Sequence, residues 1–363
     1  MKQNVNFFWK SLVVLIFPLV VVASVLFVVS CKITAEGIES LEGDFEVPVL
    51  NEFVQVNEKT FELNFSEPVE LSEICILKER NLIQNSETIS IENNSDCMKT
   101  ILLEDGSNLE IGQEFCLSGI ATDLNGNSLS FSIPFYGFNN NMAGLVLSEI
   151  RADMSKTKVE FVELYVYKSG NVGGMLLYSA SDDGKDEYVF PAAEVKKGEY
   201  IVVHFRSLEE QTAGCVDEIS GNLNLSVADD SCTDARDFWL AGSEARIGKS
   251  DVILLRERLG GKLMDSVVYA EDSLVSWKNE AFVNAVTEAV EFGVWYGGVE
   301  VSAAASSTGI TNTRTLSRQN ISQIVTAVEN NLSMPENNRN CWMITKTSSA
   351  SPGKENSSEP YVK

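Results

Sequence analysis

Few residues of this 363-residue sequence are of a type that does chemistry at neutral pH. His204 is the only histidine, which disfavours a His-based hydrolytic site and a His-ligated metal. The seven cysteines include no CxxC pair, and the sequence contains no HExxH, GxSxG, Walker or GxGxxG motif. Because Asp and Glu number 52, paired-carboxylate hydrolysis stays open as an alternative. We therefore predict no catalytic residue, no metal and no cofactor.

The first thirty residues predict export. Two lysines in the first ten residues precede an almost continuous apolar stretch from Ser11 to Val29, which is typical of a signal segment and is also long enough to span a bilayer. Val28-Val29-Ser30-Cys31 resembles a bacterial lipobox. The resemblance implies lipid on Cys31 and cleavage before it, and we favour this over an uncleaved transmembrane anchor. Lys32, directly after the cysteine, favours the outer membrane or the cell surface.

The charge balance restricts the partners. The chain has 28 basic and 52 acidic side chains, a formal net charge of -24 and a pI near 4.4. Phosphate recognition needs a basic face, so nucleic acid is excluded as a partner. An anionic body also resists adsorption to anionic lipid, which leaves the lipid anchor as the predicted membrane contact.

The remaining cysteines are candidates for disulfides, because an exported compartment permits them. Cys215 and Cys232 lie in one predicted loop and are the favoured pair, worth about 3 kcal/mol in the chain-entropy model. Cys97 and Cys116 lie on runs that flank an Asp-Gly turn and could pair across strands. The two other cysteines are left over or form an interdomain bridge, and they are Cys75 and Cys341.

Short alternating runs after the acidic tether of residues 31–46 predict a first domain of β-strands. Phe61, Leu63 and Phe65 alternate with polar residues, which is the period of a half-buried strand. About seven such runs separated by turn signals indicate an immunoglobulin-type sandwich. The predicted strands lie at 48–56, 59–65, 74–77, 88–91, 99–103, 114–121 and 128–133.

Two segments of this region resemble bacterial Ig-like domains. They are Phe65-Ser66-Glu67-Pro68-Val69 and the stretch from Gly112 to Leu129, and the resemblance extends over residues 47–138. Asp123 to Asn127 also spells the start of a calcium loop. Pro134 stands where the loop would need a bidentate Glu, so an Asn-Gly hairpin turn is predicted instead.

The second half, residues 139–356, contains five short segments in an order typical of one family. They are Leu147–Ile150, Glu160–Tyr165, Lys197–Val203, Thr315–Arg318, and Trp342 with Ser351-Pro352-Gly353 and Asn356. In these segments the second half is similar to the lamin-tail domain of bacterial secreted proteins. The resemblance implies an interaction module of Ig-like fold, and the chain carries insertions that a bare lamin-tail domain lacks.

Local patterns complete the second half. Further strands are predicted at 143–150, 159–167, 186–191 and 195–205. Asn279 to Phe292 places Phe282, Val286 and Ala289 on one face, which predicts an amphipathic helix packed on the sandwich. Residues 357–363 are predicted to be a tail.

The fold class predicted from these patterns is all-β, with two tandem Ig-like β-sandwiches, the second carrying a helical insertion, after an N-terminal signal segment of residues 1–30. We expect a lipid-anchored envelope protein that binds a protein or glycan ligand through a non-catalytic adhesive or structural module. The alternative is a carboxylate hydrolase with its site between the sandwiches. Clustered carboxylates with perturbed pKa values in a deep pocket would favour that alternative.

Overall fold

The computed structural model describes residues 45–79, 81–84, 88–93, 95–104, 109–208 and 213–362, apart from the side chain at position 82. The predicted signal segment, Cys31 and all but the last two residues of the predicted tether lie outside the described residues. The chain divides into two compact units, Met1–Glu46 and Val47–Lys363. No helix in the described part combines the length and the apolar composition that a membrane crossing requires.

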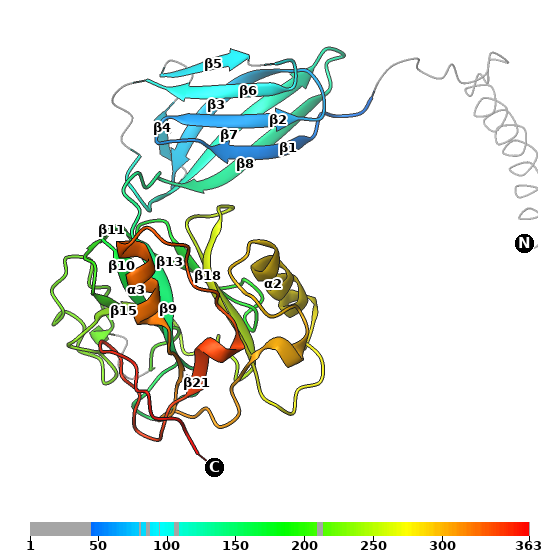
Figure 1. Cartoon of the computed structure of the whole chain (residues 1–363). Helices are drawn as coiled ribbons and strands as arrows, with labels where there is room; N and C mark the ends of the chain where they lie inside the picture. Colours follow the sequence, from blue (N-terminus) through cyan, green and yellow to red (C-terminus); the bar gives the residue numbers. More distant parts are fainter. Residues whose placement is uncertain are drawn as a thin grey trace, which may run out of the picture. The chain divides into compact units, whose positions relative to one another are not determined.

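The first β-sandwich consists of two four-stranded antiparallel sheets, ordered β1-β2-β6-β5 and β4-β3-β7-β8 (Figure 1). All seven predicted strands are present, and β4 is an eighth that the sequence patterns did not indicate. The strands are β1 (Leu50–Gln55), β2 (Thr60–Phe65), β3 (Val69–Lys78), β4 (Asn81–Gln84), β5 (Ile89–Asn93), β6 (Met98–Leu103), β7 (Glu114–Asp123) and β8 (Ser128–Tyr136).

Alternation along the strands builds the core of this sandwich. In β2 the side chains of Phe61, Leu63 and Phe65 are buried, while the residues between them are partly exposed. The Phe61 ring meets the Phe135 ring of β8 edge to face, with centroids 5.0 Å apart. Aromatic rings from both sheets therefore interlock between the layers, as the period-2 pattern predicts.

A second β-sandwich follows from Gly144 onward. Its main sheets have the orders β16-β15-β10-β9-β20-β21 and β13-β12-β17-β18-β19, and β11 pairs with β14 in a small third sheet. The strands are β9 (Gly144–Arg151), β10 (Phe161–Lys168), β11 (Gly170–Asn171), β12 (Leu176–Ser179), β13 (Tyr188–Val189), β14 (Glu194–Val195), β15 (Tyr200–His204), β16 (Arg236–Trp239), β17 (Asp251–Arg256), β18 (Leu263–Ala270), β19 (Ala305–Ser306), β20 (Leu316–Arg318) and β21 (Trp342–Ile344).

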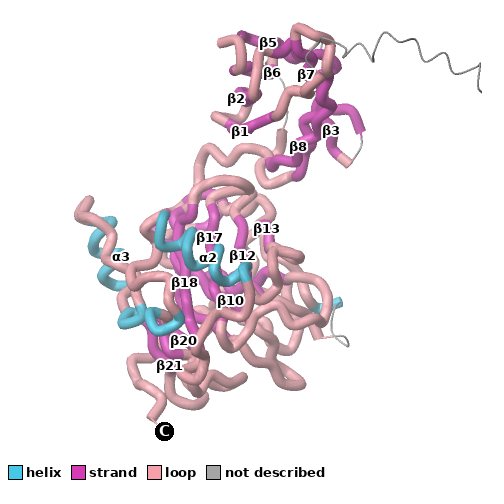
Figure 2. Tube along the Cα trace, turned by 90° about the vertical axis from the view of Figure 1, so that its right-hand side faces the viewer, coloured by secondary structure: helices cyan, strands magenta, loops and turns pink. Residues whose placement is uncertain are grey.

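The predicted amphipathic helix is confirmed as α2 (Glu280–Glu291). The side chain of Asn279 caps it by accepting a hydrogen bond from the Phe282 amide. Phe282, Val286 and Ala289 are buried in the same core as the two main sheets. Figure 2 shows α2 lying along β17 and β18, the strands that it contacts.

Other elements depart from the sequence expectations. The run at 186–191 is a strand only at Tyr188–Val189, and a turn at 196–199 divides the run at 195–205. A second helix, α3 (Ile321–Glu329), and the 3-10 turns η2 (Val301–Ala303) and η3 (Arg339–Cys341) were not predicted. The predicted tail is packed: the Tyr361 amide donates to the Ile344 carbonyl at 2.8 Å, and its ring contacts the main core.

The described part of the chain is therefore an all-β, sandwich-like fold with a small helical part, as the sequence predicts. Among the described strands, β1–β8 and β9–β21 never share a sheet, and the two stretches have separate apolar clusters.

Candidate functional site

Two carboxylates face each other at the centre of the six-stranded sheet. Glu149 on β9 and Glu163 on β10 are directly opposite in the antiparallel register, and neither has any exposed surface. Burial raises the pKa of Glu163 well above its usual range, and the charge of Glu149 raises it further. Burial also raises the pKa of Glu149, against hydrogen bonds that favour its charged form. We call these two residues the carboxylate pair.

The chain after β21 covers the carboxylate pair; we call residues 346–362 the C-terminal segment. Its Ser351 amide donates to Glu149 Oε2 at 3.0 Å, and its Gly353 amide donates to Glu163 Oε2 at 2.6 Å. Thr315, just before β20, also donates to Glu149 Oε1. Glu163 Oε1 has no hydrogen-bond partner. The pair is sealed under backbone, so these carboxylates cannot reach a substrate in this structure.

His204 lies on β15, the strand next to β10, in a similarly closed environment. Its Nε2 is 2.9 Å from Asp237 Oδ1, and its ring stacks on Trp239 with centroids 3.7 Å apart. Asp230 Oδ2 lies 3.9 Å from Nδ1 on the other side. His204 is 1% exposed and links β15 to β16 through Asp237, whereas its Nδ1 has no hydrogen-bond partner.

No disulfide joins any two of the six cysteines that the structure describes. Cys97 precedes β6 in one sheet of the first sandwich, whereas Cys116 lies on β7 of the other sheet. Phe115 and Leu117 on either side of Cys116 point into the core, so Cys116 points outward, away from the other sheet. The structure thus separates the predicted pair Cys97–Cys116.

The Cys215–Cys232 disulfide stays a prediction. In this structure the surroundings of both cysteines favour the protonated thiol. Burial raises the pKa of Cys215 to about 11, and the nearby Asp237 adds to the effect. Burial likewise raises the pKa of Cys232, whose Sγ donates to the Pro352 carbonyl at 3.2 Å.

The predicted Asn-Gly turn is a hairpin between β7 and β8. The Asp123 carboxylate accepts hydrogen bonds from the amides of Asn125 and Asn127 and from the Asn127 side chain. These bonds lower the pKa of Asp123 against the opposing effect of slight burial. Its oxygens are thus used within the turn, and no cluster of ligands fit to hold a metal is present among the described residues.

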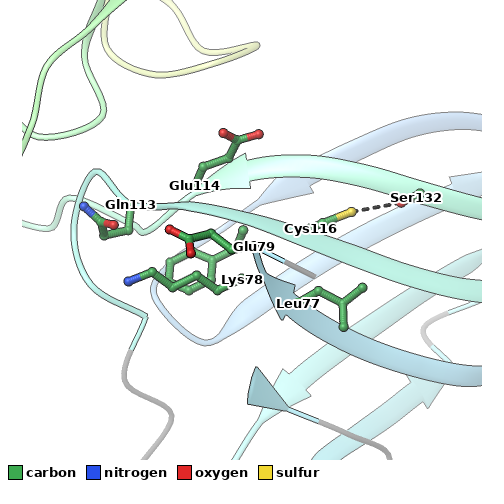
Figure 3. A pocket seen from close by; sticks show the side chains of 8 residues that line it. Leu77, Lys78, Glu79, Gln113, Glu114, Cys116 and Ser132 are labelled. Carbon is green, nitrogen blue, oxygen red and sulfur yellow. Dashed lines mark hydrogen bonds between the residues drawn. The ribbon is translucent and has the colours of Figure 1, made fainter. Parts of the chain in front are cut away.

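One hollow, of about 390 Å³, lies on the outer face of the first sandwich (Figure 3). Cys116 points across it to Ser132, with Sγ and Oγ 2.9 Å apart. Lys78 at its edge pairs with Glu110 at 3.2 Å. The lining offers no histidine and no activated nucleophile, so it supports no group transfer.

A larger hollow, of about 510 Å³, lies in the second sandwich between β10, β15, α3 and the C-terminal segment. Tyr165 and Tyr200 line it from neighbouring strands, Ile321 and Val325 from α3, and Glu355 from the C-terminal segment. We call it the tyrosine groove. The two tyrosines, Ile321 and Val325 give it aromatic and apolar surface, and the other lining residues are polar or charged, among them Arg318 and Glu355.

Sequence reasoning missed both the carboxylate pair and the tyrosine groove. The signal was present in the segment Glu160–Tyr165, because Glu163 and Tyr165 share the face opposite to Val162 and Leu164. That face reads as solvent-exposed from the alternation alone. Covering it requires the C-terminal segment, which lies almost 200 residues further along the chain.

Two solved structures align with large parts of the chain. The N-terminal part of the bacterial S-layer protein SbsC is 11% identical with a TM-score of 0.23, over 58% of this chain and 40% of that chain. Domains A168–A170 of titin are 11% identical with a TM-score of 0.15, over 60% of this chain and 56% of that chain. Neither alignment carries an argument about fold or function.

A family model, TP_1001_2nd, described as a protein second domain, matches residues 143–344. An "Uncharacterized protein" of Treponema pallidum (strain Nichols) is 34% identical over 195 residues, 51% of this chain and 48% of that protein. The chain thus spans about half the length of the curated relative that it matches. Because the model covers more than half of the sequence, from the start of β9 to the end of β21, the chain belongs to the family that this second-domain model defines.

Proposed function

We propose that this chain is an exported, lipid-anchored cell-envelope protein whose sandwiches serve as non-catalytic binding or adhesion modules. The observation that carries the proposal is the tyrosine groove, a lined hollow of about 510 Å³ beside a sheet whose own acids are sealed. The ligand belongs to a protein or a glycan of the envelope. The acidic composition disfavours nucleic acid.

The anchoring half of the proposal rests on the N-terminal pattern. A basic start, an apolar stretch and a small residue before Cys31 together favour lipid attachment over a plain anchor. The resemblance to Ig-like and lamin-tail modules supports a role in interaction. The matched lamin-tail motifs supply β9, β10, β15 and β20, the adjacent strands around the carboxylate pair.

The hydrolase alternative finds less support. It needs carboxylates with perturbed pKa values that open into a pocket. Glu149 and Glu163 have the perturbation, but their exposed fraction is 0% and a backbone amide of the C-terminal segment bonds Oε2 of each. An acid without access to solvent serves the fold.

The anchor is tested by Cys31→Ala in cells fed a labelled fatty acid. The wild-type chain should incorporate the label, partition into the detergent phase and migrate as the processed form. Cys31→Ala should lose the label and keep the unprocessed length. If both chains partition and migrate alike, lipid attachment at Cys31 is refuted.

The binding role is tested with the purified full chain in detergent and with isolated envelope fractions. Tyr165→Leu removes the aromatic ring and the hydroxyl while keeping an apolar side chain, and it should weaken retention. Tyr296→Leu alters an exposed tyrosine outside the groove and is the matched control. Equal retention of both variants would refute the groove as the binding site. Turnover of a glycoside or ester substrate that Glu163→Gln abolishes would favour the hydrolase.

A further inference from the structure

The two rings of the tyrosine groove form a corner. Tyr165 and Tyr200 are direct partners in the register of β10 and β15, with ring centroids 5.2 Å apart and planes inclined by 66°. A flat aromatic platform suits a sugar ring, whereas two inclined rings can contact a compact group from two sides. Compact cations are attracted to aromatic faces by the ring quadrupole.

The charges along the lining favour a positive ligand. Glu355 is exposed and makes no ion pair with another described residue. Arg318, the basic residue of the lining, is 3% exposed and bonds Asp265 at 2.6 Å, so its charge is already balanced. Lys354, the neighbour of Glu355 in sequence, pairs with Asp234 at 2.8 Å.

The environment of Tyr200 points the same way. Burial raises the pKa of its phenol, and the charges of Glu163 and Glu355 raise it further. The phenol therefore stays neutral at all physiological pH values, and the exposed Glu355 carboxylate makes the potential beside it negative. A cation gains from this potential, whereas an anion is repelled by it.

We propose that the tyrosine groove recognises an organic cation, an alkylated ammonium or a guanidinium group, with Tyr165 and Tyr200 against its apolar surface and Glu355 balancing its charge. The inference rests on the proposed function, because it names the ligand class of the same groove. A volume of about 510 Å³ exceeds that of such a head group, so the groove has room for the molecule that carries it.

One feature of the rim favours the opposite charge. The first turn of α3, at Ile321 and Ser322, presents backbone amides that suit an anion. Inorganic phosphate is therefore included as a competing probe.

Binding is measured calorimetrically on the full chain in detergent, at constant ionic strength. The probes are choline, its uncharged isostere 3,3-dimethylbutan-1-ol, arginine amide, inorganic phosphate and a neutral N-acetylated oligosaccharide. We expect choline or arginine amide to bind at least about tenfold more tightly than the isostere. Preference for choline identifies an alkylated ammonium, and preference for arginine amide identifies a guanidinium group.

Variants then assign the contacts. Tyr165→Leu should weaken cation binding by about 5- to 30-fold, whereas Tyr165→Phe, which keeps the ring, should retain it. Glu355→Gln should also weaken binding, and Glu291→Gln on α2, outside the groove, should not. Unchanged melting temperatures confirm that the variants are folded.

The outcomes separate this inference from the proposed function. Equal binding of choline and its isostere, tighter binding of phosphate or saccharide, or no binding of either cation overturns the cation assignment. In those cases the proposed function still stands if Tyr165→Leu loses retention on envelope fractions. If Tyr165→Leu keeps that retention and no probe binds, both the cation assignment and the groove as a binding site fail.

Discussion

The buried carboxyl group of Glu163 affects the free energy of unfolding by an amount that depends on pH. The pKa values of Glu149 and Glu163 are both raised above 4.5, so the folded chain binds more protons than the unfolded chain above that pH. The contribution of this pair to stability is therefore fully present below about pH 4.5 and is lost as the pH rises through the raised values. Glu163→Gln removes the charge but can still accept a bond from the Gly353 amide.

We expect Glu163→Gln to raise the free energy of unfolding at pH 8 by about 1–2 kcal/mol and to leave it nearly unchanged at pH 5. Urea unfolding at both pH values measures the effect, with Glu291→Gln as the exposed control. A variant that is less stable than the wild type at pH 8 would contradict the raised pKa.

The pKa of Asp251 is also raised, but replacement of its carboxyl group by an amide should destabilise the fold, in contrast to Glu163→Gln. Burial raises its pKa to about 6, against hydrogen bonds that favour the charged form. Its oxygens accept from the amides of Gly248 and Val252 and from Ser179 Oγ. An amide NH2 in Asp251→Asn would face these donors.

The expected loss for Asp251→Asn is about 2–3 kcal/mol at pH 8, measured by the same urea titration. The contrast with Glu163 is the informative part, because Glu163 Oε1 has no partner to lose. Stabilisation by Asp251→Asn would show that the network around Asp251 is not as the structure has it.

The thiol of Cys215 gives a chemical test of the disulfide prediction. With its pKa raised to about 11, only a small fraction is thiolate at pH 7.5. Alkylation without reductant should therefore be slow at pH 7.5. Its rate should increase about tenfold for each unit by which the pH is raised, until the pH reaches the pKa of about 11. Peptide mass spectrometry follows the rate at this position. If modification of Cys215 requires a reductant, the Cys215–Cys232 bond exists in the native protein.

At the scale of elements, the C-terminal segment depends on one glycine. Gly353 has φ +81°, and a Cβ there would lie 2.6 Å from the Asp234 carbonyl carbon. Gly353→Ala should therefore cost about 2–4 kcal/mol, because it strains the backbone and displaces the amide from Glu163. Gly198→Ala is the matched control: φ is +92° but nothing lies within 4 Å, so about 1 kcal/mol is expected. Equal losses in thermal melting would exclude a role for the contact with Glu163.

Local sequence patterns predicted the elements whose formation depends on nearby residues. The alternation at Thr60–Phe65 and the apolar face of Glu280–Glu291 reappear as β2 and α2. The order of the six-stranded sheet was not accessible, since β20 is three residues long and joins β9 across more than 160 residues. α3 was missed although its signal is local, since apolar residues after Asn320 recur at the i, i+3, i+4 and i+7 spacing of an amphipathic helix, at Ile321, Ile324, Val325 and Val328.

The candidate site was less predictable than the fold. Glu163 and Tyr165 alternate with apolar residues, and this pattern reads as a face in water. The C-terminal segment buries Glu163 completely and leaves Tyr165 partly exposed. The difference arises from the contact of the C-terminal segment with Glu163, and a short stretch of sequence around Glu163 does not include that segment.

For the whole molecule, the folded second sandwich extends beyond the family match. The match ends at Ile344, yet Ser351 and Gly353 satisfy the carboxylate pair, and Tyr361 packs beneath Arg314 at 4.0 Å. These contacts join the last residues to strands β9 and β10. The C-terminal segment is therefore part of the domain.

Two truncations test this boundary. A chain that ends at Thr345 loses the amide donors to Glu149 and Glu163 and exposes core surface beside Ile344. We expect its melting temperature to fall by about 10 °C or more, because several kcal/mol of buried contacts are removed. Removal of residues 1–46, which lie outside the unit Val47–Lys363, should shift melting of the remainder by no more than about 2 °C. Differential scanning calorimetry compares the two shortened chains with the full chain. Wild-type melting of the chain that ends at Thr345 would show that the carboxylate pair tolerates solvent, and would limit the domain to the residues of the family match.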